Sequence, residues 1–408
     1  MARSAKQAKP RQSGLSIPSD VATSLLVLVL LFVAMQIIPT SSRRPWDFET
    51  YWYATSAASA GLSPYDTEAL SRLAQRPFGM PFIYAPVTVL LLMPLTMLPI
   101  ASAALVWFWS KALLLAGLAV LWRRRFLPEA NPALIAAVAI FGFNAAAVWD
   151  VATGNVAIVE QALLWTGFAA YAADRRRLFA VCVVAAALFK LFPILFLVLL
   201  LAPSKRSEPS WRLAGVSLAA FLLLVFGPVL AGVPWARGFL QNLPAERPWG
   251  EVNPSALGLI DTLSGSHTQP LFARPYTLLL AWAAYIAVVI AVSVPTLRNL
   301  WRRRDPVTWV FATAVLYALL VPRMMVYTYL LVLVPVLALV SPLARRVGGI
   351  TLVGALLVAQ AVAKPWLGAR YQGTWSAHLA FLMLLGFWLV YLAAGAATAR
   401  PAPGATAR

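Results

Sequence analysis

The sequence predicts an all-α, polytopic membrane protein with about ten transmembrane helices and two further re-entrant or broken segments. Of its 408 residues, 61% are hydrophobic and only 12% are charged, whereas a soluble domain carries about 25% charged residues. Apolar runs of about twenty residues, the length that crosses about 30 Å of hydrocarbon as a helix, recur along the chain. These runs lack the alternation of a transmembrane barrel, so helices are the structure that satisfies their backbone.

The formal charge of +19 is not spread evenly along the chain. Basic residues gather in short segments between the apolar runs, which is typical of cytoplasmic loops under the positive-inside rule. This placement favours anionic lipid headgroups as the partner and excludes nucleic acid. The basic clusters occupy residues 123–125, 175–177, 205–206, 302–304 and 345–346.

The chain is expected to form a single membrane domain over residues 20–397. Residues 1–19 form a basic cytoplasmic tail, and residues 398–408, rich in Ala, Gly and Pro, form a disordered one. The first apolar run, residues 21–38, is expected to be a retained helix, because the sequence after it does not resemble a small-residue cleavage site. The lone cysteine, Cys182, lies in an apolar run and has no partner for an internal disulfide.

Two apolar segments do not fit a simple crossing. Residues 85–98 number about fourteen and contain Pro86 and Pro94, so a re-entrant or interfacial segment suits them better than a span. Residues 178–202 start and end beside basic segments, with Lys190 and Pro193 near their middle. A broken helix pair that dips into the membrane and returns accounts for both features.

The remaining helices are assigned by letting successive apolar runs cross the membrane in opposite directions. The outer loops then cover residues 39–84, 150–155, 231–275 and 364–375, and both termini are cytoplasmic. The expected spanning helices are residues 21–38, 101–122, 132–149, 156–173, 213–230, 276–297, 307–321, 324–340, 348–363 and 376–394.

The first outer loop concentrates carboxylates and aromatic side chains. Aromatic residues alone would indicate an interfacial belt, but a belt needs no carboxylates. Asp47, Glu49 and Tyr51 are close enough in sequence to share a small site. A carboxylate at the rim of an outward cavity can act as general base on a sugar or lipid hydroxyl.

Several charges at membrane depth are further candidates. Lys111 lies mid-helix with Glu160 as its expected partner, either in a functional site or in a structural ion pair. Lys190, and Arg323 with Tyr327 and Tyr329, would hold an anionic phosphate, although Arg323 would equally reach lipid headgroups. The sequence contains no HExxH, GxSxG, Walker A or paired-cysteine pattern, and His267 and His378 are far apart, so no metal or cofactor is expected.

The chain contains an ordered set of short motifs: Trp46-Asp47-Phe48-Glu49-Thr50-Tyr51, Ala60-Gly61-Leu62-Ser63-Pro64-Tyr65-Asp66, Phe82-Ile83-Tyr84-Ala85-Pro86 leading into Leu92-Met93-Pro94-Leu95, Gly154-Asn155, Lys190-Leu191-Phe192-Pro193 and Asn253-Pro254-Ser255. Together these motifs resemble glycosyltransferase family 87, bacterial enzymes of the GT-C type related to polyprenol-phosphate-mannose-dependent α-mannosyltransferases of actinobacteria. The chain departs from the family at Gly154-Asn155, where Gly-Gln is common. It also departs at Val321-Pro322-Arg323, where mycobacterial members carry Ser-Pro followed by histidines.

The resemblance implies a GT-C-type membrane enzyme of the bacterial plasma membrane. It would transfer a hexose, mannose first of all, from a polyprenyl-phosphate donor to a lipid or glycan acceptor on the extracytoplasmic face, with inversion. Asp47 matches the residue taken as catalytic base in that family. Candidate substrate- and donor-binding residues are Glu49, Tyr51, Tyr65, Tyr84, Asn155, Lys190, Asn253, Arg274, Arg323 and Tyr327.

Two other interpretations stay open. A transporter or flippase for a lipid-linked precursor would need polar residues through the full membrane depth, whereas here they crowd on one side. A related enzyme using lipid-linked arabinose or glucose differs only in its substrate.

Overall fold

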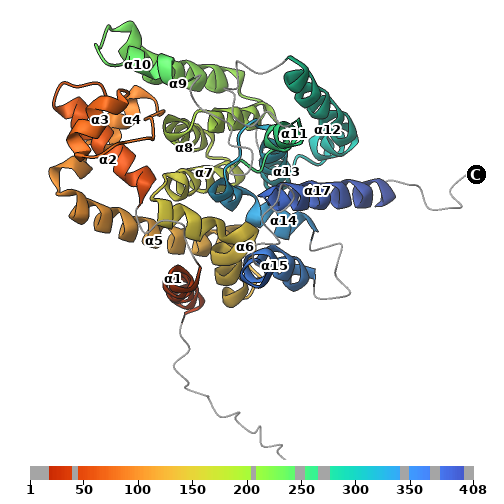
Figure 1. The fold of residues 1–408 in the computed structure, drawn as a ribbon. Coiled ribbons are helices and arrows are strands. Elements are labelled where there is room, and N and C mark those ends of the chain that lie inside the picture. Colours follow the sequence, from red (N-terminus) through yellow and green to blue (C-terminus); the bar gives the residue numbers. More distant parts are fainter. Residues whose placement is uncertain are drawn as a thin grey trace, which may run out of the picture.

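The computed structural model describes residues 18–38, 45–203, 208–243, 253–264, 276–340, 349–367 and 377–398. Within these ranges the chain is helical and no strand occurs, which confirms the all-α class (Figure 1). The helices are α1 (Ser19–Ile37), α2 (Trp46–Ser59), α3 (Thr67–Ala74), α4 (Pro86–Leu92), η1 (Met93–Met97), α5 (Ile100–Arg125), α6 (Pro132–Thr153), α7 (Ala157–Ala172), α8 (Arg176–Phe189), η2 (Phe192–Leu201), α9 (Trp211–Leu230), α10 (Arg237–Asn242), α11 (Ala256–Ser264), α12 (Tyr276–Arg303), α13 (Pro306–Leu320), η4 (Val326–Val332), α14 (Leu333–Val340), α15 (Gly349–Leu367) and α17 (Leu379–Thr398).

Five of these helices, α1, α5, α6, α9 and α12, are long and apolar enough to cross a membrane. The segments that contain η2, α13, η4 with α14, and α17 are also apolar but shorter. The polytopic membrane class is therefore confirmed. Most bounds lie within a few residues of those expected, and α6 extends four residues further than predicted, to Thr153.

Basic residues from distant parts of the chain meet on one face of the bundle, called the basic face below. Arg123 at the end of α5 pairs with Asp20 at the start of α1, N to O 2.7 Å. Glu208 accepts from Arg304 through its carboxylate at 3.0 Å and from Arg176 through its backbone carbonyl at 2.6 Å. The predicted cytoplasmic clusters at residues 123–125, 175–177 and 302–304 thus share one side, as the alternation of the helices requires. The clusters at residues 205–206 and 345–346 lie outside the residues described.

The expected broken helix pair is present as α8 and η2. The helix breaks at Lys190, whose backbone is extended (φ −141°, ψ 126°). Pro193 follows; it cannot donate a hydrogen bond, but it fits the first turn of the 3₁₀ helix η2. Thr88 Oγ1 donates to the carbonyl of Leu188 at 2.7 Å, which satisfies a group freed by the break. Arg176 Nη1 lies 3.4 Å from the carbonyl of Leu200, so the two ends of the pair return to the same side.

The segment predicted to be re-entrant or interfacial forms the two short helices α4 and η1. Pro86 is the first residue of α4 and Pro94 the second of η1, so both prolines fall in a first helical turn. Together they are too short for a crossing. With α2 and α3 they form a group at one edge of the bundle, next to α8, α9 and α10 (Figure 1).

The described part of the predicted outer loop 39–84 contains two helices, α2 and α3. Pro45 precedes α2, which runs fourteen residues without glycine or proline. Asp66 caps α3 by accepting from the backbone N–H of Glu68 at 2.9 Å. Two regular elements therefore give this segment a fixed shape against the bundle.

Helix α6 is interrupted halfway along its length. Phe143, Asn144 and Ala145 have left-handed φ values of 46°, 62° and 56°, a conformation that costs roughly 1–2 kcal/mol per non-glycine residue. At this level the ring of Phe143 packs 5.1 Å from that of Tyr329 in η4. The break separates an apolar half on the basic face from a second half, ending at Thr153, that leads into the site.

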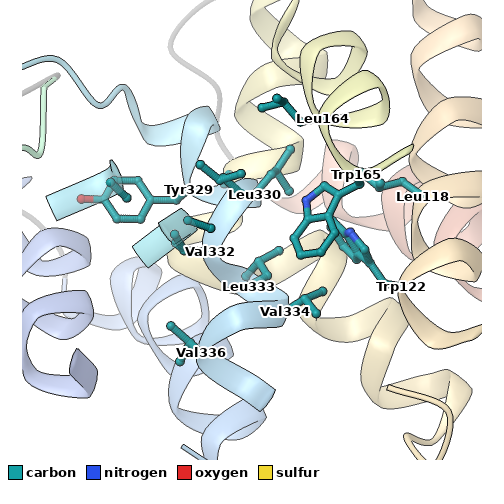
Figure 2. Packing of buried hydrophobic residues seen from close by; sticks show 14 of the residues in the cluster. Leu118, Trp122, Leu164, Trp165, Tyr329, Leu330, Val332, Leu333, Val334 and Val336 are labelled. Carbon is teal, nitrogen blue, oxygen red and sulfur yellow. The ribbon is translucent and has the colours of Figure 1, made fainter. Parts of the chain in front are cut away.

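The core lies where α5, α7 and the η4–α14 segment meet (Figure 2). Trp122 of α5 and Trp165 of α7 pack edge to face with centroids 5.7 Å apart. Leu330, Leu333 and Val334 are essentially inaccessible beside them. This packing fixes α5 relative to α7, and both helices carry residues of the site at their other ends.

Candidate active site

Asp47 lies in the first turn of α2, where the helix dipole favours a carboxylate. Its Oδ2 accepts a hydrogen bond from the side-chain amide of Asn155 at 2.9 Å, and Thr153 provides a second side-chain hydrogen bond. Asn155 and Thr153 belong to the turn that joins α6 to α7. The candidate base is therefore held from a segment more than a hundred residues away in sequence.

The α6–α7 turn approaches α2 so closely that only glycine fits at its centre. Gly154 has φ +76°, and a Cβ there would lie 2.6 Å from Cβ of Phe48. The indole of Trp107, on α5, donates to the carbonyl of Gly154 at 2.7 Å and stacks on the ring of Phe48 at 6.0 Å. Sequence reasoning missed Trp107, although its spacing of four residues from Lys111 places both on one face of α5.

Lys111 is fully buried and pairs with Asp150, Nζ to Oδ2 2.7 Å, and it also donates to the Asp150 carbonyl. The prediction that Glu160 would be its partner is wrong, because Glu160 pairs with Lys190 instead. Asp150 was expected in an outer loop, yet it is a buried residue of α6. Partners inside a bundle depend on how the helices rotate against each other, which sequence spacing alone does not reveal.

The environment of Asp47 changes its acidity in opposing ways. Burial raises the pKa of the Asp47 carboxyl above its usual value, because water no longer solvates the charge. The hydrogen bonds from Asn155 and Thr153, and the charge of Lys111, act to lower that pKa. A carboxylate with a raised pKa accepts a proton more readily, as a general base requires.

Three tyrosines link α2 to the loop before α4. The hydroxyls of Tyr51 and Tyr84 lie 2.7 Å apart, and the hydroxyl of Tyr65 donates to the Tyr84 carbonyl at 2.8 Å. Burial raises the pKa of Tyr84, so it stays a neutral hydrogen-bonding group. Tyr84 lies between Asp47, with which it interacts electrostatically, and the cavity described next.

A cavity of about 120 Å³ opens beside Tyr84. Lys190, at the break between α8 and η2, reaches it with Nζ 3.0 Å from Glu160 Oε2 and 4.7 Å from the centre of the Tyr327 ring. The cavity thus holds two cationic groups, Lys190 and Arg323, and one carboxylate. Its lining residues are Ile83, Tyr84, Ala85, Glu160, Phe189, Lys190, Leu191, Phe192, Leu243, Tyr317, Arg323, Met325, Tyr327 and Thr328.

Arg323 is fixed through the backbone on either side of it. Asn253 donates to the Pro322 carbonyl at 3.1 Å and accepts from the Met324 N–H at 2.7 Å. Ser255 donates to the same carbonyl at 2.8 Å. Asn253 is fully buried, and both the nitrogen and the oxygen of its side-chain amide are hydrogen-bonded. It would therefore act on a substrate indirectly, by positioning Arg323.

The structure brings most of the predicted residues to one end of the bundle. Tyr84, Lys190, Arg323 and Tyr327 line the cavity, whereas Asp47 lies beside it, next to Asn155. Glu49 pairs with Arg76 at the edge of α2. Arg274 and His267 lie outside the residues described.

One of the two histidines, His378, lies within the described residues. His378 is buried and bonds to the hydroxyl of Thr262 at 3.1 Å. Within the described ranges, no three His, Cys, Asp or Glu side chains gather as metal ligands would.

Comparisons with known proteins bear on the family. No curated protein matches the chain. The model of glycosyltransferase family 87 matches residues 82–323, more than half of the chain. The match includes Tyr84, Asn155, Lys190 and Arg323 and begins after α2, so Asp47 lies outside it. With the helical membrane fold, this match shows that the chain belongs to glycosyltransferase family 87.

Proposed function

We propose that this glycosyltransferase moves a hexose, mannose in the first place, from a polyprenyl-phosphate donor to a hydroxyl of a lipid or glycan acceptor, with Asp47 as general base. The observation that carries the proposal is the pairing of two unlike environments: a carboxylate held by Asn155, next to a cavity containing Lys190 and Arg323. A base and an anion site side by side are what transfer from a sugar phosphate needs.

The reaction requires one proton transfer and one exchange of bonds at the anomeric carbon. Asp47 takes the proton of the acceptor hydroxyl as that oxygen forms a bond to the anomeric carbon. The bond between this carbon and the phosphate oxygen breaks on the opposite side, and its electron pair leaves with the polyprenyl phosphate. Displacement from the opposite side inverts the configuration.

The cations of the cavity would stabilise the departing phosphate. The donor phosphodiester carries one negative charge, whereas the released monoester carries up to two near neutral pH. Lys190 and Arg323 would stabilise this additional negative charge, because charge-assisted hydrogen bonds are roughly twice as strong as neutral ones. Glu160 Oε2 lies 3.0 Å from Lys190 Nζ and balances its charge.

The apolar part of the cavity suits a lipid donor. Phe189, Leu191 and Phe192 line it beside Lys190. From Phe192 an exposed apolar row continues along η2 through Leu195 and Val198, because residues three apart align in a 3₁₀ helix. A polyprenyl chain could follow this row into the lipid while its phosphate stays at Lys190.

The side of the membrane follows from charge. The α6–α7 turn, which holds Asp47, lies at the end of the bundle opposite the basic face. The positive-inside rule assigns the basic face to the cytoplasm. The site would therefore face the extracytoplasmic side of a bacterial plasma membrane. The choice of mannose rests on the family resemblance, with arabinose and glucose as the other donor sugars.

The competing function is a transporter or flippase for a lipid-linked precursor. Such a protein needs polar groups along a path through the membrane. Within the described residues, the site's charges, Asp47, Lys111, Asp150, Glu160, Lys190 and Arg323, gather towards one end of the bundle. This one-sided distribution favours chemistry at a membrane boundary.

The test supplies purified protein in lipid vesicles with polyprenyl-phosphate mannose labelled in the sugar, and with lipid acceptors. A transferase yields a labelled acceptor and free polyprenyl phosphate in equal amounts. If labelled donor instead crosses the bilayer unchanged, the transporter interpretation holds and the transferase proposal is wrong. Donors carrying arabinose or glucose, supplied in parallel, identify the sugar.

A further inference from the structure

A buried ion pair lies close enough to the proposed base to interact with its charge, and the chemistry described above does not use it. Lys111 and Asp150 have no solvent exposure and lie 2.7 Å apart, Nζ to Oδ2. Burying two charges carries a desolvation penalty that a pair of apolar residues would avoid. A retained pair at this depth therefore calls for a role, and its contacts show what it holds in place.

Asp150 organises the whole α6–α7 turn. Its carbonyl accepts from the N–H groups of Gly154 at 3.0 Å and Asn155 at 3.1 Å. Its Oδ1 accepts from the N–H of Ala157, the first residue of α7, at 3.0 Å. The carboxylate thus bridges the end of one helix and the start of the next, with Thr153 and Asn155 between them.

Helix α5 contacts this turn at two points one helical turn apart. Trp107 donates to the carbonyl of Gly154 at 2.7 Å, and Lys111 binds both the carboxylate and the carbonyl of Asp150. Residues four apart lie on the same face of a helix, so a single face of α5 supports the turn. Trp107 also stacks on Phe48, the neighbour of Asp47.

We propose that Trp107, Lys111 and Asp150 are positioning residues that fix the α6–α7 turn so that Asn155 and Thr153 meet Asp47 in its reactive orientation. The inference rests on the proposed function of Asp47 and adds to it a support that no substrate touches. Small displacements of a catalytic group lower rate strongly, which gives such a support its value.

The test compares Trp107→Phe and Lys111→Met with the parent and with Asn155→Ala. Trp388→Phe, on α17, is the matched control. This change also removes a buried indole hydrogen bond, which Trp388 donates to Ser293 Oγ at 3.0 Å. Both positioning variants should lower kcat roughly 10- to 100-fold with the donor KM nearly unchanged. The acid limb of their pH profiles should move to higher pH, as in Asn155→Ala, since Asp47 loses donors that favour its charged form.

Hydrogen–deuterium exchange of residues 150–157 gives a second measurement that needs no activity. Exchange should rise in Trp107→Phe and Lys111→Met and stay at the parental level in Trp388→Phe. Unchanged exchange, or an acid limb that stays in place as in the control, would overturn the positioning role. If the parent shows no transferase activity, the proposed function fails while the exchange result still decides whether these residues hold the turn.

Asp150→Asn separates acceptor geometry from charge. An asparagine retains an oxygen for the N–H of Ala157, whereas Asp150→Ala does not. The Asn variant should therefore keep more activity and more protection of residues 150–157 than the Ala variant. Equal loss in both would contradict the positioning role of Asp150.

Discussion

Asn155 donates a hydrogen bond to Asp47 at 2.9 Å, and this contact joins the start of α2 to the turn between α6 and α7. On one side of it lies the buried Lys111–Asp150 pair, and on the other the tyrosines that border the cavity. The contact therefore links the proposed base to the part of the fold that supports it and to the part that would bind the donor.

The acidity of Asp47 predicts a pH dependence. Because burial raises the pKa of this carboxyl, it remains protonated, and inactive as a base, up to a higher pH than an exposed aspartate. Activity should therefore rise with pH along a limb that lies above the usual aspartate value of 3.8. The dependence of kcat/KM on pH measures this limb; one that lies at or below 3.8 would contradict the assigned environment.

Replacing Gly154 with alanine should damage the site and the fold together. The added Cβ would lie 2.6 Å from Phe48, in a backbone conformation with φ +76°. We expect a loss of about 1–3 kcal/mol of stability and most of the activity. Thermal unfolding in detergent and the transfer assay measure the two effects. Gly117→Ala, in open space within α5, is the control and should retain both.

Lys190→Gln should weaken use of the donor. The change removes a cation from the cavity and leaves the buried Glu160 without its partner. Hydrogen bonds to charged groups contribute about 1.5–3 kcal/mol, so kcat/KM for the donor should fall roughly 10- to 100-fold. Arg304→Gln removes an exposed ion pair on the basic face and should leave donor kinetics unchanged. Equal kinetics in the two variants would remove Lys190 from the donor site.

The membrane orientation can be tested by labelling single cysteines. In a Cys182→Ala background, a cysteine at the exposed position Arg72, on α3, should react with an impermeant reagent added to whole cells. A cysteine at the exposed position Arg303 should react only after the membrane is opened. The reverse pattern would place the site on the cytoplasmic side.

The main features of the membrane fold could be predicted from the sequence. Charge clusters indicated which helix ends share a face, and the pairing of Arg304 and Arg176 with Glu208 agrees with that prediction. Lys190 followed by Pro193 indicated the broken pair, because proline ends a regular hydrogen-bond pattern. These signals are local in sequence, so no tertiary information was needed.

The pairing of charges inside the bundle could not be predicted. The sequence does not show how α5 is rotated against α6 and α7. That rotation determines that Lys111 pairs with Asp150 and not with Glu160. The interruption of α6 at Phe143 could not be predicted either, because no proline marks it in the sequence. The role of Asn253 in holding the backbone around Arg323 depends on a contact across about seventy residues.

The most direct test of the central claim compares Asp47→Asn with the parent in the transfer of labelled mannose from polyprenyl phosphate to lipid acceptors. Asparagine keeps an oxygen for Asn155 but cannot take the acceptor proton, so kcat should fall about 10²- to 10⁴-fold. Asp66→Asn retains the cap of α3 and should react at the parental rate. Parental kcat in Asp47→Asn would contradict the assignment of Asp47 as the base.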